Sequence, residues 1–438
     1  MTELDEGVWP QTAALDLDGV LRVAGRRVTD LIEEFGSPLL VLDEADFRAR
    51  CRAMKEAFGD ADVYYAGKAF LCTAVARWVM EEGLGLDVCT GGELAVAQRA
   101  GVPGERITFH GNNKSVSELE RAIDYGVARI AIDSVEEIAR LSSAATARGV
   151  RQRVYLRVTP GVEAHTHEYV STGQEDQKFG FSLASGAAIE AVAAVIAQRS
   201  LELVGIHAHI GSQIFDTAGF GLACHRMVGL LAEIRTRHGL ELPELNLGGG
   251  LGIAYTSADA PLAVDEVAER LSAVMAKECA AAGLTPPRLA VEPGRAIVGP
   301  TTVTLYTVGT VKRLPGVRTY VSVDGGMSDN IRPALYGARY TAILASRTSS
   351  SDPQVVTVCG KHCESGDIVV HDVPLPGDIT AGDVIAVPAS GAYHRSMASN
   401  YNHVPRPPVV AVLDGQARVI VRRETEEDLL CTDVGTDA

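Results

Sequence analysis

The chain has 438 residues, of which 46% are hydrophobic and 22% charged, and its formal net charge at pH 7 is −16. This acidity argues against nucleic acid or an anionic membrane as the main partner, because both are negatively charged themselves. The length suggests two domains, or one large barrel with an appendage. The N-terminus lacks an apolar signal region, no apolar run is long enough to span a bilayer, and the scattered cysteines form no C-x-x-C pair, so we expect a cytoplasmic protein.

Between residues 62 and 294, short apolar runs with strand character alternate with longer runs of helical pattern. The expected strands are 62–67, 85–90, 106–111, 128–133, 153–159, 203–211, 244–250 and 288–294. Apolar strands that alternate with helices form parallel sheets covered by helices, and eight such units in roughly 250 residues predict a (β/α)8 TIM barrel. A doubly wound open sheet is the alternative, but it usually has fewer strands and would place a phosphate loop after the first strand, where none is found.

After residue 300 the pattern changes to short β-type runs separated by glycine, proline and aspartate turns, which is typical of a mostly antiparallel β-domain. Residues 14–28 have strand character as well, although they precede the barrel. We therefore expect a barrel over residues 43–303, a C-terminal β-domain over residues 304–438, and an N-terminal segment, 1–42, that joins the β-domain. The acidic tail from residue 424 is expected to fray.

Polar and charged residues stand where the predicted barrel strands end, which is where enzymes of this architecture carry their active sites. They are Lys68, Asp87, His110, Asp133, Arg157, His207, His209 and Glu292. Polar residues that merely mark strand exits would account for two or three of these. Lys68 and Glu292 fit that interpretation poorly, since a lysine is almost never fully buried unless it is paired.

Two H-x-H pairs allow a second interpretation, a metal hydrolase. One pair, at 207–209, shares one face of a strand, and the other, at 165–167, lies in a long polar loop. Asp87 and Asp133 could complete a zinc shell. This hypothesis leaves Lys68 and the glycines after the seventh strand unexplained, and the first histidine of the strand pair, taken alone, is better explained as a hydrogen-bonded core residue.

Lys68, the glycine turn at 248–250 and Glu292 together indicate pyridoxal phosphate. A lysine desolvated among apolar groups has a lowered pKa, and its neutral amine forms Schiff bases with carbonyls. The backbone N–H groups of a glycine turn can approach an anion closely, and barrels often bind phosphate with the loops after strands seven and eight. A carboxylate such as Glu292 keeps the ring nitrogen of the cofactor protonated, which makes the ring a strong electron sink.

The motifs YYAGKAF, HAHIGSQ, LGGGLG, EPGR, DGGMSDNIRPALYGA, CESGD and GAY occur in this order across nearly the whole chain. With them the sequence closely resembles the diaminopimelate decarboxylases, which belong to the alanine-racemase-like, fold type III pyridoxal-phosphate enzymes. EPGR and GGG alone would indicate only the broader group that includes ornithine and arginine decarboxylases, whereas DNIRPALY with CESGD points to the diaminopimelate branch. The sequence departs from the family at Gly67, usually aliphatic, and at Phe70, where asparagine is common; both flank the lysine rather than replace it.

The resemblance implies a role for each motif residue. Lys68 would form the Schiff base with pyridoxal phosphate, His209 would stack on the cofactor ring, and Glu292 would pair with the ring nitrogen. The phosphate would be held by Ser212, Gly249, Gly250 and the backbone from Glu292 through Gly294 to Arg295. The substrate carboxylates would be bound by Arg295, Arg332 and Tyr336, the distal ammonium by Glu364, and both cofactor and substrate by Tyr393, with Cys363 as the proton donor. No metal ligand is implied.

These roles imply decarboxylation of meso-2,6-diaminopimelate to L-lysine and CO2, the last step of lysine biosynthesis. The family forms its site between two subunits, with the CESGD segment coming from the partner, so the resemblance also implies an obligate homodimer. The alternative is a decarboxylase of the same fold that acts on ornithine, arginine or a carboxylated polyamine, none of which has a distal carboxylate.

Two further hypotheses fit the sequence less well. An amino-acid racemase would share Lys68 but should be a shorter chain. A non-catalytic protein, either a cofactor carrier or a pseudo-enzyme, should have lost catalytic positions such as Cys363. An inert turn cysteine is the plain reading of Cys363, because Cys359 lies nearby in sequence.

Overall fold

The computed structural model describes residues 4–162 and 178–435, so most of the long loop, with its H-x-H pair at 165–167, lies outside the described residues. The chain forms two compact units. One, the barrel unit, comprises residues 50–252 and 261–294, and the other, the β-unit, comprises residues 1–49, 253–260 and 295–438. Each unit is described by itself below.

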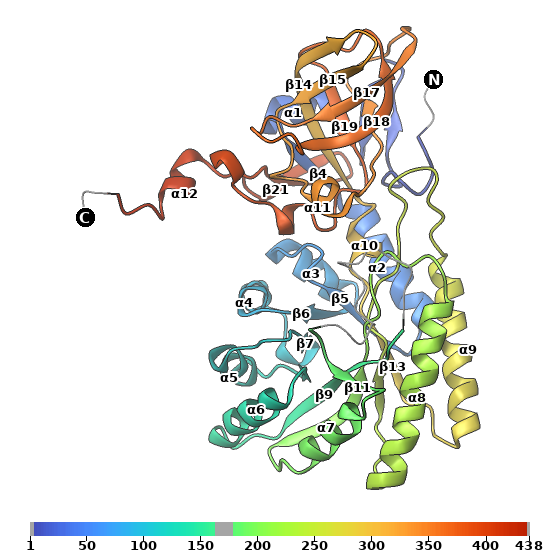
Figure 1. The fold of residues 1–438 in the computed structure, drawn as a ribbon. Helices are drawn as coiled ribbons and strands as arrows, with labels where there is room; N and C mark the ends of the chain where they lie inside the picture. Colours follow the sequence, from blue (N-terminus) through green and yellow to red (C-terminus); the bar gives the residue numbers. More distant parts are fainter. Residues whose placement is uncertain (1–3, 163–177, 436–438) are drawn as a thin grey trace. The chain divides into compact units, whose positions relative to one another are not determined.

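Within the described residues, eight parallel strands form a closed ring in the barrel unit (Figure 1). They are β5 (Asp62–Ala66), β6 (Gly85–Val88), β7 (Ile107–Phe109), β8 (Arg129–Ile132), β9 (Gln152–Thr159), β11 (Leu201–His207), β12 (Glu244–Asn246) and β13 (Arg288–Val291). The ring closes because β13 pairs with β5, with Ala290 opposite Asp62. A short strand, β10 (Phe181–Ser182), extends β9 outside the ring. The predicted TIM barrel is therefore confirmed.

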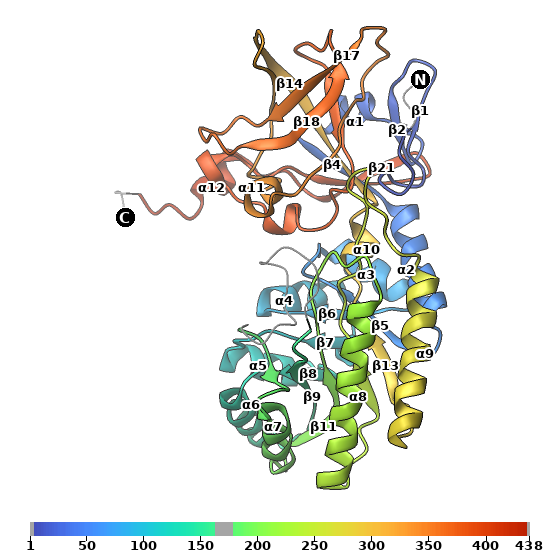
Figure 2. The ribbon, with the colours of Figure 1, turned by 45° about the vertical axis from the view of Figure 1, so that its right-hand side comes forward.

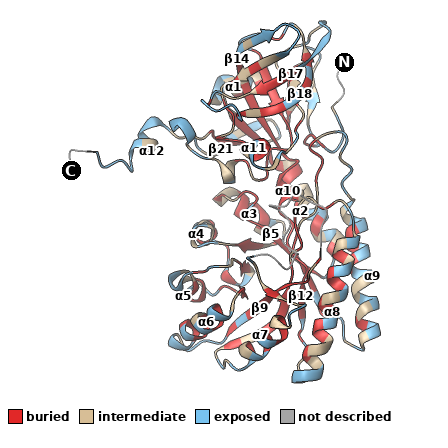
Figure 3. Ribbon diagram, in the orientation of Figure 1, coloured by how far each residue is buried: buried red, intermediate tan, exposed pale blue. Residues whose placement is uncertain are grey.

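Helices follow the strands and lie around the ring, as predicted. They are α2 (Glu44–Phe58), α3 (Thr73–Glu81), α4 (Gly91–Ala100), the short 3-10 turn Gly104–Arg106, α5 (Val116–Asp124), α6 (Val135–Ala147), α7 (Ala187–Ile196), α8 (Ala218–His238) and α9 (Val264–Ala282). Thr90, Ser115 and Ser134 cap three of them by accepting the backbone N–H three residues on. In Figure 2, α8 and α9 lie side by side. Figure 3 shows the strands mostly buried and the outer helix faces exposed, so the apolar runs of the sequence form the core.

The β-unit is a mostly antiparallel sheet with short helices. Its strands are β4 (Leu39–Asp43), β14 (Thr302–Leu314), β15 (Arg318–Val323), β16 (Ile343–Leu344), β17 (Pro353–Cys359), β18 (Ile368–Pro376), β19 (Val384–Val387), β20 (Val409–Leu413) and β21 (Gln416–Val421), and a separate three-stranded sheet is made of β1 (Ala14–Leu15), β2 (Leu21–Val23) and β3 (Arg26–Arg27). Its helices are α1 (Val28–Phe35), α10 (Arg295–Val298), α11 (Arg332–Tyr336) and α12 (Glu426–Leu430), with 3-10 turns at Arg395–Met397 and Tyr401–His403. The expected joining of the N-terminal segment is confirmed, because β4 lies between β14 and β20.

The acidic tail differs from the sequence-based expectation. Residues 426–430 form α12, which a capping box stabilises: the Thr425 side chain accepts from the backbone N–H of Asp428, whose carboxylate accepts from the N–H of Thr425. Among the helices that the structure describes, none has both the length and the apolar sequence needed to cross a membrane. All eight cysteines fall in the described ranges, and all are free thiols, in agreement with the absence of a disulfide framework.

Candidate active site

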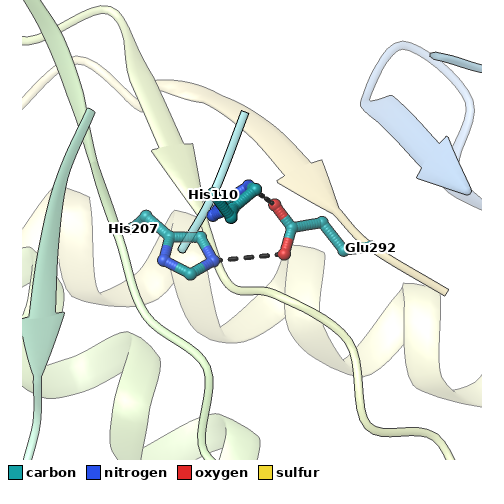
Figure 4. A group of neighbouring side chains, drawn as sticks. All are labelled: His110, His207 and Glu292. Atoms are coloured by element: carbon teal, nitrogen blue, oxygen red, sulfur yellow. Dashed lines mark hydrogen bonds and ion pairs between the residues drawn. The ribbon is translucent and has the colours of Figure 1, made fainter. Parts of the chain in front are cut away.

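Glu292 directly follows β13 at the carboxyl end of the barrel, and side chains from other strand ends surround its carboxylate (Figure 4). His110 Nε2 lies 2.8 Å from Oε1, and His207 Nε2 hydrogen-bonds to Oε2 at 3.1 Å. Asn246 Nδ2 donates to Oε1 at 2.7 Å. All four side chains are buried. A carboxylate offers about four acceptor positions, so this arrangement leaves one on Oε2 for a further donor.

The charges of this cluster follow from its contacts. Burial alone would raise the pKa of Glu292, but His110 and His207 outweigh it and hold that pKa well below its usual range. Burial alone would lower the pKa of His110, but the carboxylates of Glu292 and Asp87 outweigh it and raise that pKa. Burial lowers the pKa of His207 to about 4, so this ring is a neutral donor near pH 7. The barrel thus holds a buried, ionised carboxylate at the end of its last strand.

His209 and the glycine turn at 248–250 lie together, after the neighbouring strands β11 and β12. The Gly249 N–H donates to His209 Nδ1 at 3.2 Å, which fixes the ring. Burial lowers the pKa of His209 well below its usual range, so the imidazole is neutral and carries its proton on Nε2. A Cβ on Gly249 would collide with the Glu292 carbonyl oxygen, and Gly250 has a φ of +114°, which only glycine adopts readily.

The loop that carries Ser212 runs beside the glycine turn. The Ile214 N–H donates to the Gly250 carbonyl at 2.9 Å, and Ile214 bridges Leu251. Ser212, Gly249 and Gly250, which the sequence predicted as phosphate ligands, are therefore brought to one place, where backbone N–H groups can approach an anion.

Lys68 lies in the turn after β5, next to the EPG turn. The Ala66 N–H donates to the Pro293 carbonyl at 3.0 Å, and a Cβ on Gly294 would stand only 2.9 Å from that of Ala66. The expected desolvation of Lys68 is wrong for the chain by itself: its neighbours Gly67 and Ala69 are buried, but Lys68 is exposed. The strand ends at Ala66, so Lys68 is no longer enclosed by the sheet.

Among the described residues, which exclude the pair at 165–167, the ligands predicted for a metal hydrolase do not form a group. His209 Nδ1 is occupied by the Gly249 N–H, and Asp133 pairs with Arg157 at 3.4 Å and accepts the Gly180 N–H at 2.7 Å. Among the described residues, the group that could offer three ligand atoms within 4.8 Å of one another is His110, His207 and Glu292. There each imidazole contacts a carboxylate oxygen directly, which is the arrangement of a hydrogen-bonded cluster.

A second group of predicted residues lies in the β-unit. Arg332, at the start of α11, donates from Nε to the Tyr340 hydroxyl at 2.7 Å and stands over the rings of Tyr255 and Tyr336, 5.1 and 5.6 Å from their centroids. Arg295, at the start of α10, donates from Nη1 to the Tyr255 hydroxyl. The structure thus brings two buried guanidiniums together around one tyrosine.

Tyr393 belongs to the same group. Its ring centroid lies 4.6 Å from the Arg295 guanidinium, and its backbone φ is +62°. A bulky residue with a positive φ is unusual and marks a position where the surrounding structure enforces the conformation, often at a functional site. Of the residues predicted to bind carboxylates or contact the substrate, Arg295, Arg332, Tyr336 and Tyr393 therefore lie together.

Cys363 and Glu364 lie on the loop between β17 and β18, and both are exposed. Contacts inside the loop fix its conformation: the buried carboxylate of Asp367 accepts hydrogen bonds from the backbone N–H and from the ring Nδ1 of His362, each at 2.8 Å. The Cys363 N–H donates to Asn402 Oδ1 at 3.0 Å. The roles of Cys363 and Glu364 stay predictions.

Sequence reasoning missed the partners of the charged groups. Asn246 and Tyr340 were not singled out, and His110 was noted at a strand end without a role. The sequence carries a weak signal for His110, which lies near the end of a predicted strand, directly before Gly111, whereas Asn246 lies inside the predicted strand 244–250, where no pattern marks it. Tyr340 lies outside the predicted strands and outside the motifs, so no sequence pattern indicated it.

Comparisons with known proteins decide the family. Residues 44–299 match the model for the pyridoxal-dependent decarboxylase, pyridoxal-binding domain. Diaminopimelate decarboxylase of Mycobacterium tuberculosis is 55% identical over 443 residues, which cover 99% of both chains. The chain belongs to the diaminopimelate decarboxylase family. A Bacillus subtilis member is 47% identical, with 97% of each chain covered.

Solved structures of the family have the same fold. Diaminopimelate decarboxylase of M. jannaschii superposes with a TM-score of 0.92 at 32% identity, covering 98% of this chain and 99% of that one. The Helicobacter pylori enzyme complexed with L-lysine superposes with a TM-score of 0.85 at 29% identity, covering 92% and 98%.

The barrel unit fits the pyridoxal phosphate that this family uses. The remaining acceptor position on Glu292 Oε2 suits a protonated ring nitrogen, which is itself an N–H donor. The glycine turn suits the phosphate, because side chains there would collide with neighbouring backbone. The neutral imidazole of His209 presents a flat ring without charge, as stacking on a cationic ring requires.

Proposed function

We propose that this protein removes one carboxyl group from meso-2,6-diaminopimelate and releases L-lysine and CO2, the last step of lysine biosynthesis. The observation that carries the proposal is the pair of buried guanidiniums, Arg295 and Arg332, walled by tyrosine rings. A guanidinium binds a carboxylate through two parallel N–H···O bonds. Ornithine and arginine have a single carboxylate, which is the group lost, so a second guanidinium would have no ligand in their decarboxylases.

Pyridoxal phosphate, when bound, supplies an electron sink for the carbanion that CO2 leaves behind. In this proposal Lys68 would provide the amine that holds the cofactor. Glu292 keeps a proton on the ring nitrogen, and His209 stacks on the ring. The phosphate is held by Ser212, Gly249, Gly250, Gly294 and the backbone that leads into Arg295.

The substrate is oriented by its two ends. The carboxylate that is retained is gripped by a guanidinium fork, for which we propose Arg332, with Arg295 and Tyr336 completing carboxylate recognition. Glu364 binds the distal ammonium, and Tyr393 contacts cofactor and substrate. Cys363 holds the proton on Sγ that is delivered to the carbon that has lost CO2. This proton replaces the carboxyl group, so the amino acid released is lysine.

We further propose that the protein works as a homodimer in the cytoplasm. The exposure of Cys363 and Glu364 in the single chain supports a dimer in which the CESGD loop of the partner completes the site. The eight free thiols support a reducing compartment. Sedimentation at micromolar concentration tests the dimer, because a chain that stays monomeric while fully active would exclude a shared site.

The test of function is decarboxylation by purified protein supplied with pyridoxal phosphate. Meso-diaminopimelate, ornithine, arginine and lysine are offered in parallel, and both CO2 and the amino product are measured. We expect L-lysine from diaminopimelate alone, no turnover by Lys68→Ala, and normal turnover by Lys277→Ala, an exposed lysine of α9. Turnover of ornithine or arginine at a comparable rate would overturn the substrate proposal and leave the cofactor assignment intact.

A further inference from the structure

We infer that Tyr340 and His394 are positioning residues for Arg332 and so set the affinity for the carboxylate that Arg332 binds. The inference deepens the proposed function and rests on it, since there Arg332 grips the retained carboxylate of the substrate. Neither residue belongs to a motif that pointed to the family, and both are buried within the β-unit.

The hydrogen bonds of Arg332 leave one end of its guanidinium open. Of its five N–H groups, the one on Nε donates to Tyr340 at 2.7 Å. The four on Nη1 and Nη2 have no hydrogen bond or ion pair with any residue that the structure describes, although Arg332 is only 6% exposed. The guanidinium carbon lies over the rings of Tyr255 and Tyr336, 5.1 and 5.6 Å from their centroids, so the hydrogen-bonding positions that stay open are those of the two Nη atoms.

Tyr340 decides which edge of the guanidinium a carboxylate can use. A carboxylate can bind two parallel N–H groups either along the edge formed by Nε and one Nη, or at the end formed by both Nη atoms. The Tyr340 hydroxyl occupies the Nε position. A carboxylate is therefore directed to the end formed by the two Nη atoms, in one orientation.

His394 completes this arrangement by accepting the Tyr340 proton. Its Nε2 lies 2.8 Å from the Tyr340 oxygen, and the two rings meet edge-on with centroids 5.4 Å apart. Burial, together with the nearby charges of Arg332 and Arg295, lowers the pKa of His394 well below its usual range, so the imidazole is neutral and can accept. With its proton turned toward His394, the hydroxyl presents a lone pair to Arg332 Nε.

The test measures binding of L-lysine and of cadaverine to the holoenzyme by calorimetry. L-lysine carries the retained carboxylate, whereas cadaverine has the same two amines and no carboxylate. In Tyr340→Phe, which loses only the hydroxyl, we expect the Kd of L-lysine to rise about tenfold, as for loss of one hydrogen bond to a charged group. The Kd of cadaverine should change less than about twofold. Tyr320→Phe, on β15, is the matched control and should change neither.

A second variant separates positioning from a loose fold. If His394 acts through Tyr340, His394→Leu should weaken L-lysine about threefold by itself and add nothing in the Tyr340→Phe background, because coupled residues are not additive. An equal loss for L-lysine and cadaverine, or full additivity of the two substitutions, would overturn the inference. Binding is measured without turnover, so a failure of decarboxylation would count against the proposed function alone.

Discussion

Glu244, the first residue of β12, carries a carboxylate that binds several side chains at the amino end of the barrel. Arg129 donates from Nε and Nη2 to its two oxygens, each at 2.5 Å, and the Tyr155 hydroxyl donates at 2.5 Å. Arg153 adds a contact at 3.2 Å. Because Glu244, Arg129 and Tyr155 are all buried, we predict that removal of this carboxylate strongly destabilises the barrel unit.

The magnitude follows from what Glu244→Ala leaves behind. Arg129 would stay buried without a counter-charge, and breaking a buried pair in this way costs about 3–5 kcal/mol. Glu241→Ala is the matched control, since Glu241 pairs with Arg235 at 3.4 Å on the surface. An exposed pair of that kind contributes about 0–1 kcal/mol.

The assay is urea unfolding followed by tryptophan fluorescence. The two tryptophans report on different units, because Trp78 is buried on α3 in the barrel unit and Trp9 is buried in the β-unit. In a Trp9→Phe background the signal therefore follows the barrel. A loss of less than about 1 kcal/mol for Glu244→Ala would refute the reasoning, because the pair would then behave as an exposed one.

The same carboxylate gives the experiment a pH dependence of known sign. Burial alone would raise the pKa of Glu244, but the hydrogen bonds from Arg129 and Tyr155 outweigh it and lower that pKa. A lowered folded-state pKa contributes stability that is fully present above the unfolded value, about 4.3, and is lost as the pH falls through the folded value. The difference between wild type and Glu244→Ala should therefore be largest near neutral pH and shrink in acid; a difference that grew in acid would contradict the assignment.

Three further outcomes are expected. Arg332→Lys keeps a charge but loses the fork, so KM for meso-diaminopimelate should rise roughly tenfold or more with a smaller change in kcat; an unchanged KM would exclude a bidentate grip. Cys363→Ala should lower kcat by about 10²–10⁴-fold while L-lysine binding stays within about twofold, and an unchanged kcat would remove Cys363 as the proton donor. Exhaustive chelation should leave activity unchanged; loss that added zinc restores would instead assign a metal to His110, His207 and Glu292.

The barrel, and the strand ends at which the candidate site residues lie, could be predicted from sequence because both depend on local patterns. Eight apolar runs alternating with helical ones imply the closed ring, and parallel strands bring their ends, with Lys68, His209 and Glu292, to one side. The contacts made at that side could not be predicted in the same way. His110 reaches Glu292 across the ring from β7, which is not a neighbour of β13, and a contact between strands that are not neighbours leaves no trace in a local pattern.

The burial of single side chains was also beyond the sequence. The apolar neighbours of Lys68 suggested a desolvated lysine, but the strand ends two residues earlier and the side chain is exposed. Tyr340 and His394 are 54 residues apart, and their hydrogen bond exists only because the β-unit folds both segments around Arg332. The motif resemblance identified Arg332, whereas only the structure identified Tyr340 and His394 as the residues that position it.

The position of β4 has a consequence for synthesis on the ribosome. This strand, Leu39–Asp43, is made early, yet it pairs with β14 and with β20, which ends roughly 370 residues later. At about 5–20 residues per second, β4 waits about 20–75 s for this last partner, and until β14 is made its apolar sequence has no strand to pair with. The barrel unit can complete its ring before then, since its last strand ends at Val291. Until β14 follows, the nascent chain thus carries a finished barrel tethered to an unpaired N-terminal strand with open, aggregation-prone edges.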